Sequence, residues 1–362
     1  PIVADEARTF GMEGMFRQLG IYAPRGQQYK PVDRDQLMYY REDEAGQVLE
    51  EGITECGAFS SWMAAATSYS TNDVQMLPFY IYYSMFGFQR IGDSAWQAAD
   101  MRARGFLLGA TAGRTTLNGE GLQHEDGHSH LLSSAIPNCR SYDPTFGYEV
   151  VVILQHGMQR MLDEQVDEYY YLTLMNENYA HPAMPEGAAD GIIKGMYLLT
   201  DAGKPKKNEV RVQLLGSGTI LREAIAAAEL LDKDFGVTAD IWSCPSFTEL
   251  ARDGQAAERW NRRNPEAKKL QVPYITQLLD GRQGPAIAAT DYVRIFAEQV
   301  RPYVPMHYTV LGTDGFGRSD TRANLRRHFE VDRHHIAHAA IAALAADGKM
   351  TGKDVARAMT LY

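Results

Sequence analysis

Hydrophobic and polar positions along the first half of the chain alternate between strand-like and helix-like patterns. Dense apolar runs predict buried strands at 76–83, 105–111, 138–142 and 169–175. Small and apolar residues at helical spacing predict helices at 54–69, 93–104 and 149–162. This alternation of strands and helices predicts an α/β fold with a mainly parallel sheet flanked by helices.

The second half repeats this alternation after a polar break. Thr200–Glu209 is polar, basic and interrupted by glycine and proline, which is typical of a linker. Beyond it we predict a helix near 221–233, helices rich in alanine at the end, and strands at 210–216, 237–244, 286–290 and 308–312. The sequence therefore predicts two domains, 1–199 and 210–362, joined by a linker at 200–209.

Composition narrows the class of protein. The 362 residues are 45% hydrophobic and 23% charged, which is typical of a globular chain, and the net charge of -10 argues against binding nucleic acid. No apolar run approaches the roughly 18 residues of a membrane span, so we expect no membrane association. Cys56, Cys139 and Cys244 lie far apart, which favours free thiols and a cytoplasmic location. Because the chain enters its first element directly at Pro1, we expect it to be part of a longer protein.

The histidine-rich segment His124–His130 is the sharpest local signal for chemistry. His128 and His130 are spaced as on one face of a strand, and His124 could join them around a metal. However, Gly121 and Gly127 exclude a regular helix, and no HExxH motif is present, so we predict no metal site. Histidines that move protons or orient a substrate in a cleft are favoured, and surface histidines in a polar loop stay an alternative.

Carboxylates and aromatic residues supply further candidates, each with a plain structural alternative. Glu55 lies at the start of a helix of small and apolar residues, where it is either a partly solvated carboxylate or a buried one that shares a proton with a ring nitrogen of a ligand. Asp5 and Glu6 precede a possible helix and fit capping. Glu120 lies between glycines, as a solvated loop acid would. The aromatic residues at 79–88 fit a core, although one or two could stack on a ligand.

Two glycine-rich turns do not form nucleotide-binding motifs. Gly109–Thr116 follows a predicted strand but lacks the spacing and the lysine of a phosphate loop. Gly216–Gly218 also lies between a strand and a helix, but Leu221 stands where a dinucleotide fingerprint has its third glycine. We therefore interpret the second turn as structural.

Four longer stretches carry a family resemblance: Glu51–Ser70, Pro78–Asp93, Gly113–Leu131 and Leu311–Asp332. Together they resemble the thiamine-diphosphate-dependent decarboxylase component of the bacterial pyruvate dehydrogenase complex, homodimeric type. The resemblance covers essentially the whole chain. It corresponds to the C-terminal part of the family, a pyrimidine-binding middle domain followed by a C-terminal domain, and implies a transketolase-like fold.

The resemblance also implies roles for individual residues. Glu55 matches the glutamate that hydrogen-bonds the aminopyrimidine ring and activates the cofactor. Phe86 matches the aromatic residue that stacks on the pyrimidine, and Ile53 lies where an apolar side chain helps to hold the cofactor bent. Residues that match positions at the reacting centre are Tyr83, Glu120, His124, Asp5 and Glu6. Of these, we expect His124 and Tyr83 to orient the substrate or the lipoyl group.

The activity implied by the resemblance is oxidative decarboxylation of pyruvate, followed by reductive acetylation of a lipoyl group on the dihydrolipoamide acetyltransferase. One departure matters, because Gly92-Asp93-Ser94 is not the GDG motif with which the family binds the cofactor diphosphate through Mg²⁺. We therefore expect the Mg²⁺ ligands on a missing N-terminal domain, without which this chain is expected to be inactive. The segment Arg25–Arg41 resembles a mobile loop that closes over the site.

Three alternatives stay open at this point. The chain could belong to another thiamine-diphosphate enzyme, such as a transketolase or a dehydrogenase of a different 2-oxo acid. It could be a non-catalytic subunit that keeps the fold for assembly, although assembly alone needs none of Glu55, Tyr83 and His124. A metal hydrolase built on the histidine-rich segment would require stoichiometric zinc.

Overall fold

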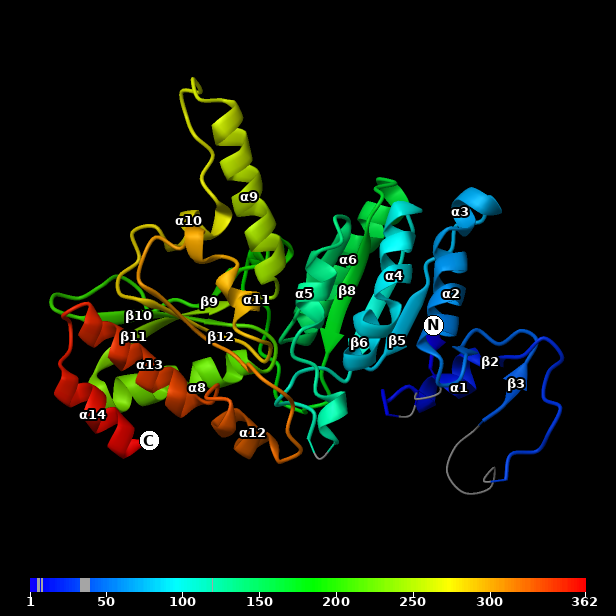
Figure 1. Ribbon diagram of the computed structural model, residues 1–362, viewed down its shortest axis with the longest axis horizontal. Helices are drawn as coiled ribbons and strands as arrows, with labels where there is room; N and C mark the ends of the chain where they lie inside the picture. The colour runs from blue at the N-terminus through cyan, green and yellow to red at the C-terminus, as the bar shows by residue number, and fades with distance from the viewer. Residues whose placement is uncertain (5–6, 8, 33–39, 119) are drawn as a thin grey trace. The chain divides into compact units, whose positions relative to one another are not determined.

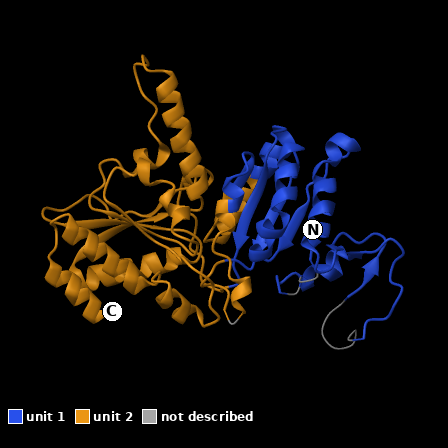
Figure 2. Cartoon of the chain, viewed as in Figure 1, with its two compact units in different colours: residues 1–112, 132–140, 157–176 blue, residues 113–131, 141–156, 177–362 orange. Residues whose placement is uncertain are grey.

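The computed structural model describes residues 1–4, 7, 9–32, 40–118 and 120–362, and the chain in it divides into two compact units (Figures 1 and 2). The first unit comprises residues 1–112, 132–140 and 157–176. The second comprises residues 113–131, 141–156 and 177–362. This division follows spatial grouping rather than order along the chain, and the boundaries predicted from the sequence stay a prediction.

The first sheet has six strands within the described residues, and each pair with a defined register is parallel. In spatial order its strands are β4 (Leu49–Glu50), β1 (Ile2–Val3), β5 (Phe79–Tyr82), β6 (Phe106–Ala110), β8 (Tyr169–Leu174) and β7 (Cys139–Tyr142). The four strands predicted in this half are confirmed, with shorter bounds. The two strands β1 and β4 have only two residues each, too few for a periodic pattern to reveal.

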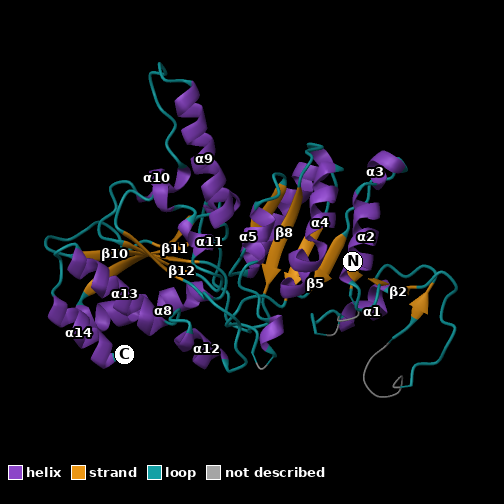
Figure 3. Cartoon of the chain, in the orientation of Figure 1, coloured by secondary structure: helices purple, strands orange, loops and turns teal. Residues whose placement is uncertain are grey.

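Helices accompany this sheet, as Figure 3 shows by colour. The other elements of the first unit are α1 (Glu13–Leu19), β2 (Ile21–Tyr22), β3 (Glu42–Asp43), α2 (Glu55–Ala66), α3 (Ser68–Thr71), η1 (Ser84–Phe86), α4 (Gly87–Asp100) and the π-turn η3 (Gln159–Asp163). Of the elements between β6 and β8 in the sequence, η2 (Leu122–His124) and most of α6 (Gly147–Met158) belong to the second unit, and α5 (Ser129–Ser134) is divided between the two. The helix predicted near 93–104 begins six residues earlier, at Gly87. It starts there because the 3₁₀ turn η1 leads straight into it.

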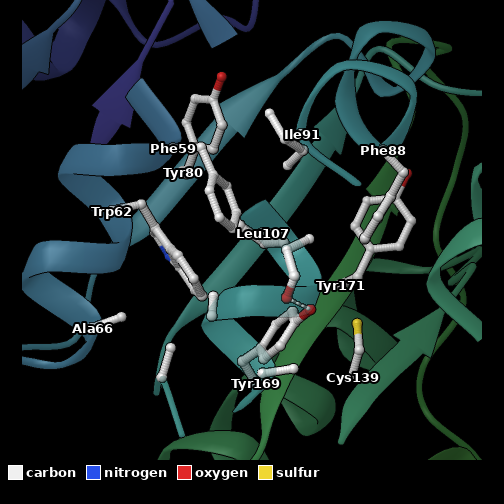
Figure 4. Close-up of a cluster of buried hydrophobic side chains, with 14 of the residues drawn as sticks. Phe59, Trp62, Ala66, Tyr80, Phe88, Ile91, Leu107, Cys139, Tyr169 and Tyr171 are labelled. Atoms are coloured by element: carbon white, nitrogen blue, oxygen red, sulfur yellow. Dashed lines mark hydrogen bonds between the residues drawn. The ribbon is translucent and has the colours of Figure 1, made fainter. Parts of the chain in front are cut away.

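Aromatic side chains dominate the core of the first unit (Figure 4). The rings of Phe59 and Trp62 stack with centroids 5.0 Å apart, and Tyr82 stacks over Tyr171 at 6.4 Å. The indole N–H of Trp62 donates to the carbonyl oxygens of Pro78 and Phe106 at 3.2 and 3.1 Å. Large rings bury much apolar area, so this core packs α2 against β5.

The second unit contains a five-stranded sheet within the described residues. Its order is β13 (Tyr308–Leu311), β12 (Ala286–Ala289), β10 (Val210–Gly216), β11 (Val237–Ser243) and β9 (Tyr197–Thr200). All pairs are parallel except that of β9 with β11. The four predicted strands are confirmed, and the predicted mainly parallel α/β architecture holds in both units.

The helices of the second unit include the long helix α9, which is labelled in Figure 1. The remaining elements are α7 (Ala188–Lys194), α8 (Ile220–Phe235), α9 (Phe247–Arg263), α10 (Tyr274–Leu279), α11 (Ile295–Glu298), η4 (Arg301–Tyr303), α12 (Arg322–His328), α13 (Arg333–Ala346) and α14 (Gly352–Leu361). The turn Gly216–Gly218 joins β10 to α8 tightly, because a Cβ on Gly216 would lie 2.6 Å from the Leu221 Cα. That close packing supports its interpretation as a structural turn.

The cysteines and the length of the helices can be compared with the expectations from composition. Cys56, Cys139 and Cys244 are free thiols, as predicted. Among the described residues, each helix is too short or too polar to cross a lipid bilayer.

Candidate active site

Glu55 begins helix α2, and the local sequence explains why the helix starts there. The Thr54 hydroxyl accepts a hydrogen bond from the Gly57 N–H at 3.4 Å, which caps the helix. The Glu55 residue is 8% exposed, so the alternative of a solvated helix-start carboxylate is wrong.

The Glu55 carboxylate is paired with an arginine that the sequence analysis did not single out. Arg90 on α4 donates from Nη1 to the Glu55 Oε1 at 2.7 Å. The Arg90 side chain is 47% exposed, so water reaches one end of this pair while the carboxylate lies inside. Within the described residues, the second carboxylate oxygen of Glu55 has no hydrogen bond.

Arg90 also covers a ring face of Phe86. Its guanidinium carbon lies 4.2 Å from the Phe86 ring centroid, a cation–π distance. A planar cationic group therefore sits between a buried carboxylate and an aromatic face. Had the start of α4 been recognised at Gly87, Arg90 would have been placed about one turn from Phe86, and this neighbour could have been inferred.

Aromatic rings continue from Phe86 toward the N-terminal segment. Tyr83 and Phe86 meet edge to face with centroids 6.1 Å apart, and Phe10 approaches Tyr83 in the same manner at 5.4 Å. Both Tyr83 and Phe86 are half-buried. Ile53, two residues before Glu55, is 72% exposed and presents an apolar side chain to solvent. The three rings form a partly open aromatic surface beside the ion pair.

Glu120 and His124 form a second arrangement, located in the second unit. The His124 Nδ1 lies 3.0 Å from the Glu120 Oε2, and the two side chains are 22% and 39% exposed. The short helix η2 places His124 one turn after Glu120. A carboxylate beside one ring nitrogen fixes the orientation of an imidazole, which suits proton transfer or substrate positioning at the other nitrogen.

The other two histidines of this segment do not join His124. His130 is fully buried and packs against Phe296, and its Nδ1 lies 2.8 Å from the Ser141 Oγ. Burial lowers the pKa of His130 to about 3, so this ring stays neutral. The described residues contain no group of three or more His, Cys, Asp and Glu side chains suited to hold a metal ion. The geometry therefore gives no support to a metal hydrolase built on these histidines.

The candidate residues thus fall into two sets, each described within its own unit. Glu55 is linked to Phe86 through Arg90, and Tyr83 extends that group. Glu120 and His124 form the other set. Asp5 and Glu6 lie outside the described residues, as does the stretch 33–39 of the predicted closing loop Arg25–Arg41.

Comparison with protein families gives two matches along the chain. A family model described as the pyruvate dehydrogenase E1 component middle domain matches residues 1–182. A second, the transketolase-like C-terminal domain, matches residues 195–332.

Curated proteins show high identity over the whole chain. A pyruvate dehydrogenase E1 component of Pseudomonas aeruginosa is 65% identical over 100% of this chain and 41% of its own length. Those of Cupriavidus necator and Escherichia coli K12 are 63% and 62% identical, again over 100% of this chain and 40% of their own lengths. The chain thus spans about two fifths of the length of these relatives.

Solved structures show the same fold at low identity. A transketolase from Campylobacter jejuni superimposes with a TM-score of 0.66 at 17% identity, covering 94% of this chain and 43% of its own. A transketolase from Leishmania mexicana gives a TM-score of 0.66 at 14% identity, covering 98% of this chain and 44% of its own. The fold is therefore transketolase-like, as predicted.

Proposed function

Because this chain belongs to the pyruvate dehydrogenase E1 component family, we propose that it supplies the pyrimidine-binding half of a thiamine diphosphate site. The complete enzyme would oxidatively decarboxylate pyruvate and reductively acetylate the lipoyl group of a dihydrolipoamide acetyltransferase. The observation that carries the proposal is the buried Glu55 carboxylate beside the Phe86 ring, with Arg90 between them.

The residues present fit an aminopyrimidine ring. Such a ring is planar, aromatic and basic at a ring nitrogen, so it needs a flat apolar neighbour and a carboxyl group at its edge. Phe86 offers the first and Glu55 the second, and the Arg90 guanidinium already occupies a comparable position as a planar cation. The exposed Ile53 adds an apolar surface close to Glu55 in sequence.

Bound thiamine diphosphate would supply a thiazolium carbon that attacks a ketone and a ring that accepts the electrons released by decarboxylation. Glu55 would hold a proton on its carboxyl group and share it with the ring nitrogen, for which a buried position excludes competing water. His124 and Tyr83 would orient pyruvate or the lipoyl group, and Glu120 would hold the His124 ring in place. We assign supporting roles near the reacting centre to Asp5 and Glu6.

Two parts of the site are proposed to lie outside this chain. We infer that Mg²⁺ and the cofactor diphosphate are held by a domain N-terminal to it, which the relatives have room for, since the chain matches only 41% of the Pseudomonas aeruginosa protein. We also propose a homodimer with cytoplasmic location, in which the acetyltransferase is the macromolecular partner.

The test is an enzyme assay on a protein that joins this chain to the N-terminal region of the Pseudomonas aeruginosa relative. We expect turnover of pyruvate to exceed that of 2-oxoglutarate by at least tenfold, with reduction of a lipoyl acceptor. Preference for 2-oxoglutarate, or for a sugar phosphate as in a transketolase, would identify another thiamine-diphosphate enzyme. A folded protein that binds the cofactor and turns over none of these substrates would favour the non-catalytic alternative.

A further inference from the structure

The segment that carries Glu120 and His124 is held at its start by a buried carboxylate. Asp291 is fully buried and accepts hydrogen bonds from the Thr115 N–H, the Thr115 hydroxyl and the Thr116 hydroxyl at 2.9, 2.6 and 2.6 Å. Arg322 adds a bond from its Nε to the Thr116 carbonyl at 2.6 Å. The beginning of the segment is therefore fixed by several satisfied donors.

The end of the segment is held quite differently, by Glu125, the residue after His124. The Glu125 Oε2 accepts a hydrogen bond from the backbone N–H of Arg318, 193 residues away in sequence, at 2.5 Å. Its other oxygen, Oε1, is buried without a hydrogen-bond partner among the described residues. Glu125 is 1% exposed, so water does not substitute for that partner.

Arg114 ties the same two stretches of chain together. It is 3% exposed, and its Nη1 donates to the carbonyl oxygens of Thr313 and Gly315 at 2.5 Å each. A Cβ on Gly127 would lie 2.4 Å from the guanidinium carbon, so a larger residue there would displace Arg114. Arg114 precedes the Glu120–His124 pair in the sequence and Glu125 follows it. Both residues hydrogen-bond to the backbone of the 313–318 segment.

Gly317 allows the 313–318 segment to approach the loop that carries His124 closely. A Cβ at Gly317 would lie 2.7 Å from the Leu122 carbonyl oxygen and 2.8 Å from the Glu125 Cβ. Both are below any ordinary van der Waals contact. The glycine-rich stretch 311–320 therefore forms the surface on which the His124 loop packs. The proposed function assigns this stretch no chemistry.

The ionised form of Glu125 is disfavoured when the loop and the 313–318 segment are in contact. Burial raises the pKa of Glu125 to about 7, against the lowering effects of the Arg318 N–H and the Arg114 charge, while Asp291 acts in the raising direction. The carboxyl group is therefore protonated in the closed loop at mildly acid pH. When the loop opens and water reaches Glu125, its ordinary pKa near 4.5 returns. Closure is thus favoured below pH 7 and weakened as pH rises through 7.

We propose that Glu125 is a positioning residue that, through its bond to the Arg318 N–H, clamps the Glu120–His124 loop onto the 313–318 segment and so sets the order of that loop. The link to catalysis rests on the proposed function, in which His124 orients the substrate. The clamp itself is a property of this chain alone, because both of its sides lie in the second unit.

Hydrogen exchange on this chain, followed between pH 5 and 8.5 and corrected for intrinsic rates, tests the clamp without cofactor. We expect protection of residues 120–126 and 314–318 to fall by about 75-fold between pH 5 and 8.5, out of a limit of about 300-fold set by pKa values of about 7 in the closed loop and 4.5 in the open one. In Glu125→Gln, which keeps an acceptor for the Arg318 N–H but cannot ionise, protection should be independent of pH. Equal pH dependence in both proteins would overturn the proposal.

Gly317→Ala supplies a second variant that changes no titrating group. It should lower protection by a similar factor at every pH and leave the pH dependence intact, which keeps the test decisive if Glu125→Gln fails to fold. Gly352→Ala is the matched control, since a Cβ there meets nothing within 4 Å, and Glu266→Gln controls for loss of an exposed acid. Protection that is unchanged in Gly317→Ala would contradict the clamp.

The link to catalysis is read separately in the enzyme joined to its N-terminal region. We expect kcat of the wild type to fall as pH rises, with an apparent pKa near 7. The kcat of Glu125→Gln should show no such fall. If the clamp responds to pH but no turnover of pyruvate is found, the proposed function fails and the clamp stands. If turnover is found and both proteins share one pH profile, Glu125 does not position the catalytic loop.

Discussion

Two buried glutamates, one in each unit, differ in the kind of partner that holds them. Glu55 accepts from the guanidinium of Arg90, a side chain that is 47% exposed. Glu125 accepts from a backbone N–H and leaves its second oxygen buried and unpartnered. A side-chain partner can swing away without moving the backbone, whereas a backbone partner can be lost only if a loop moves. The first arrangement suits exchange for a ligand, and the second suits a clamp.

The strongest test of this contrast is removal of the Glu55 acid. We expect Glu55→Gln, in the enzyme joined to its N-terminal region, to lower kcat by about 10²–10⁴, the usual contribution of a general acid or base. Turnover of pyruvate at saturating cofactor measures the effect. Glu266→Gln, which removes an exposed acid, should keep full activity. Near-normal kcat in Glu55→Gln would remove Glu55 from the chemistry.

Arg90→Met tests whether the arginine is an exchangeable partner. Arg90 occupies both the carboxylate and the ring face that a pyrimidine would need in the proposed site. Its removal should therefore tighten thiamine diphosphate binding by about tenfold, as expected for one lost competing hydrogen bond to a charged group. The unpaired carboxylate should also lower stability without cofactor. Calorimetric titration of thiamine diphosphate into the enzyme joined to its N-terminal region measures the affinity, with Arg259→Met as the exposed control. Weaker binding would mean that Arg90 is part of the cofactor site.

A third carboxylate, Asp332, is paired with a histidine, and we expect this pair to make the smallest contribution to stability. Asp332 caps α13 and accepts from the His335 Nδ1 at 2.7 Å, which raises the pKa of His335. The added stability is complete below pH 6.5 and is lost as pH rises through the raised pKa. We expect less than about 1 kcal/mol, since His335 is partly exposed. Urea unfolding of wild type and His335→Gln should differ more at pH 5.5 than at pH 9, and a constant difference would contradict this assignment.

Most strands followed from the sequence, because buried parallel strands are continuous apolar runs. Val210–Gly216 was predicted with its observed bounds for that reason. Strands β1 and β4 were missed because two residues carry no period. The start of α4 was placed too late because Gly87, normally a helix breaker, here begins the helix and lies against the Tyr82 ring.

The candidate site was predictable only where residues are close in sequence. Glu120 and His124, four residues apart, were named as candidates through the family resemblance, and their contact at 3.0 Å is of the short range that a local sequence can encode. The burial of Glu55 and its pairing with Arg90 depend on how α2 packs on α4, which no local pattern encodes. The bond between Glu125 and Arg318 joins residues 193 positions apart, so it could emerge only from the folded chain.

We propose that this chain holds half of a thiamine diphosphate site. Calorimetric titration of thiamine diphosphate with Mg²⁺ into this chain, into the N-terminal region of the Pseudomonas aeruginosa relative, and into an equimolar mixture tests it most directly. We expect no detectable binding to either part alone and one cofactor bound per chain in the mixture. Tight stoichiometric binding to this chain alone would show that it contains a complete diphosphate anchor and would contradict the assignment of half a site.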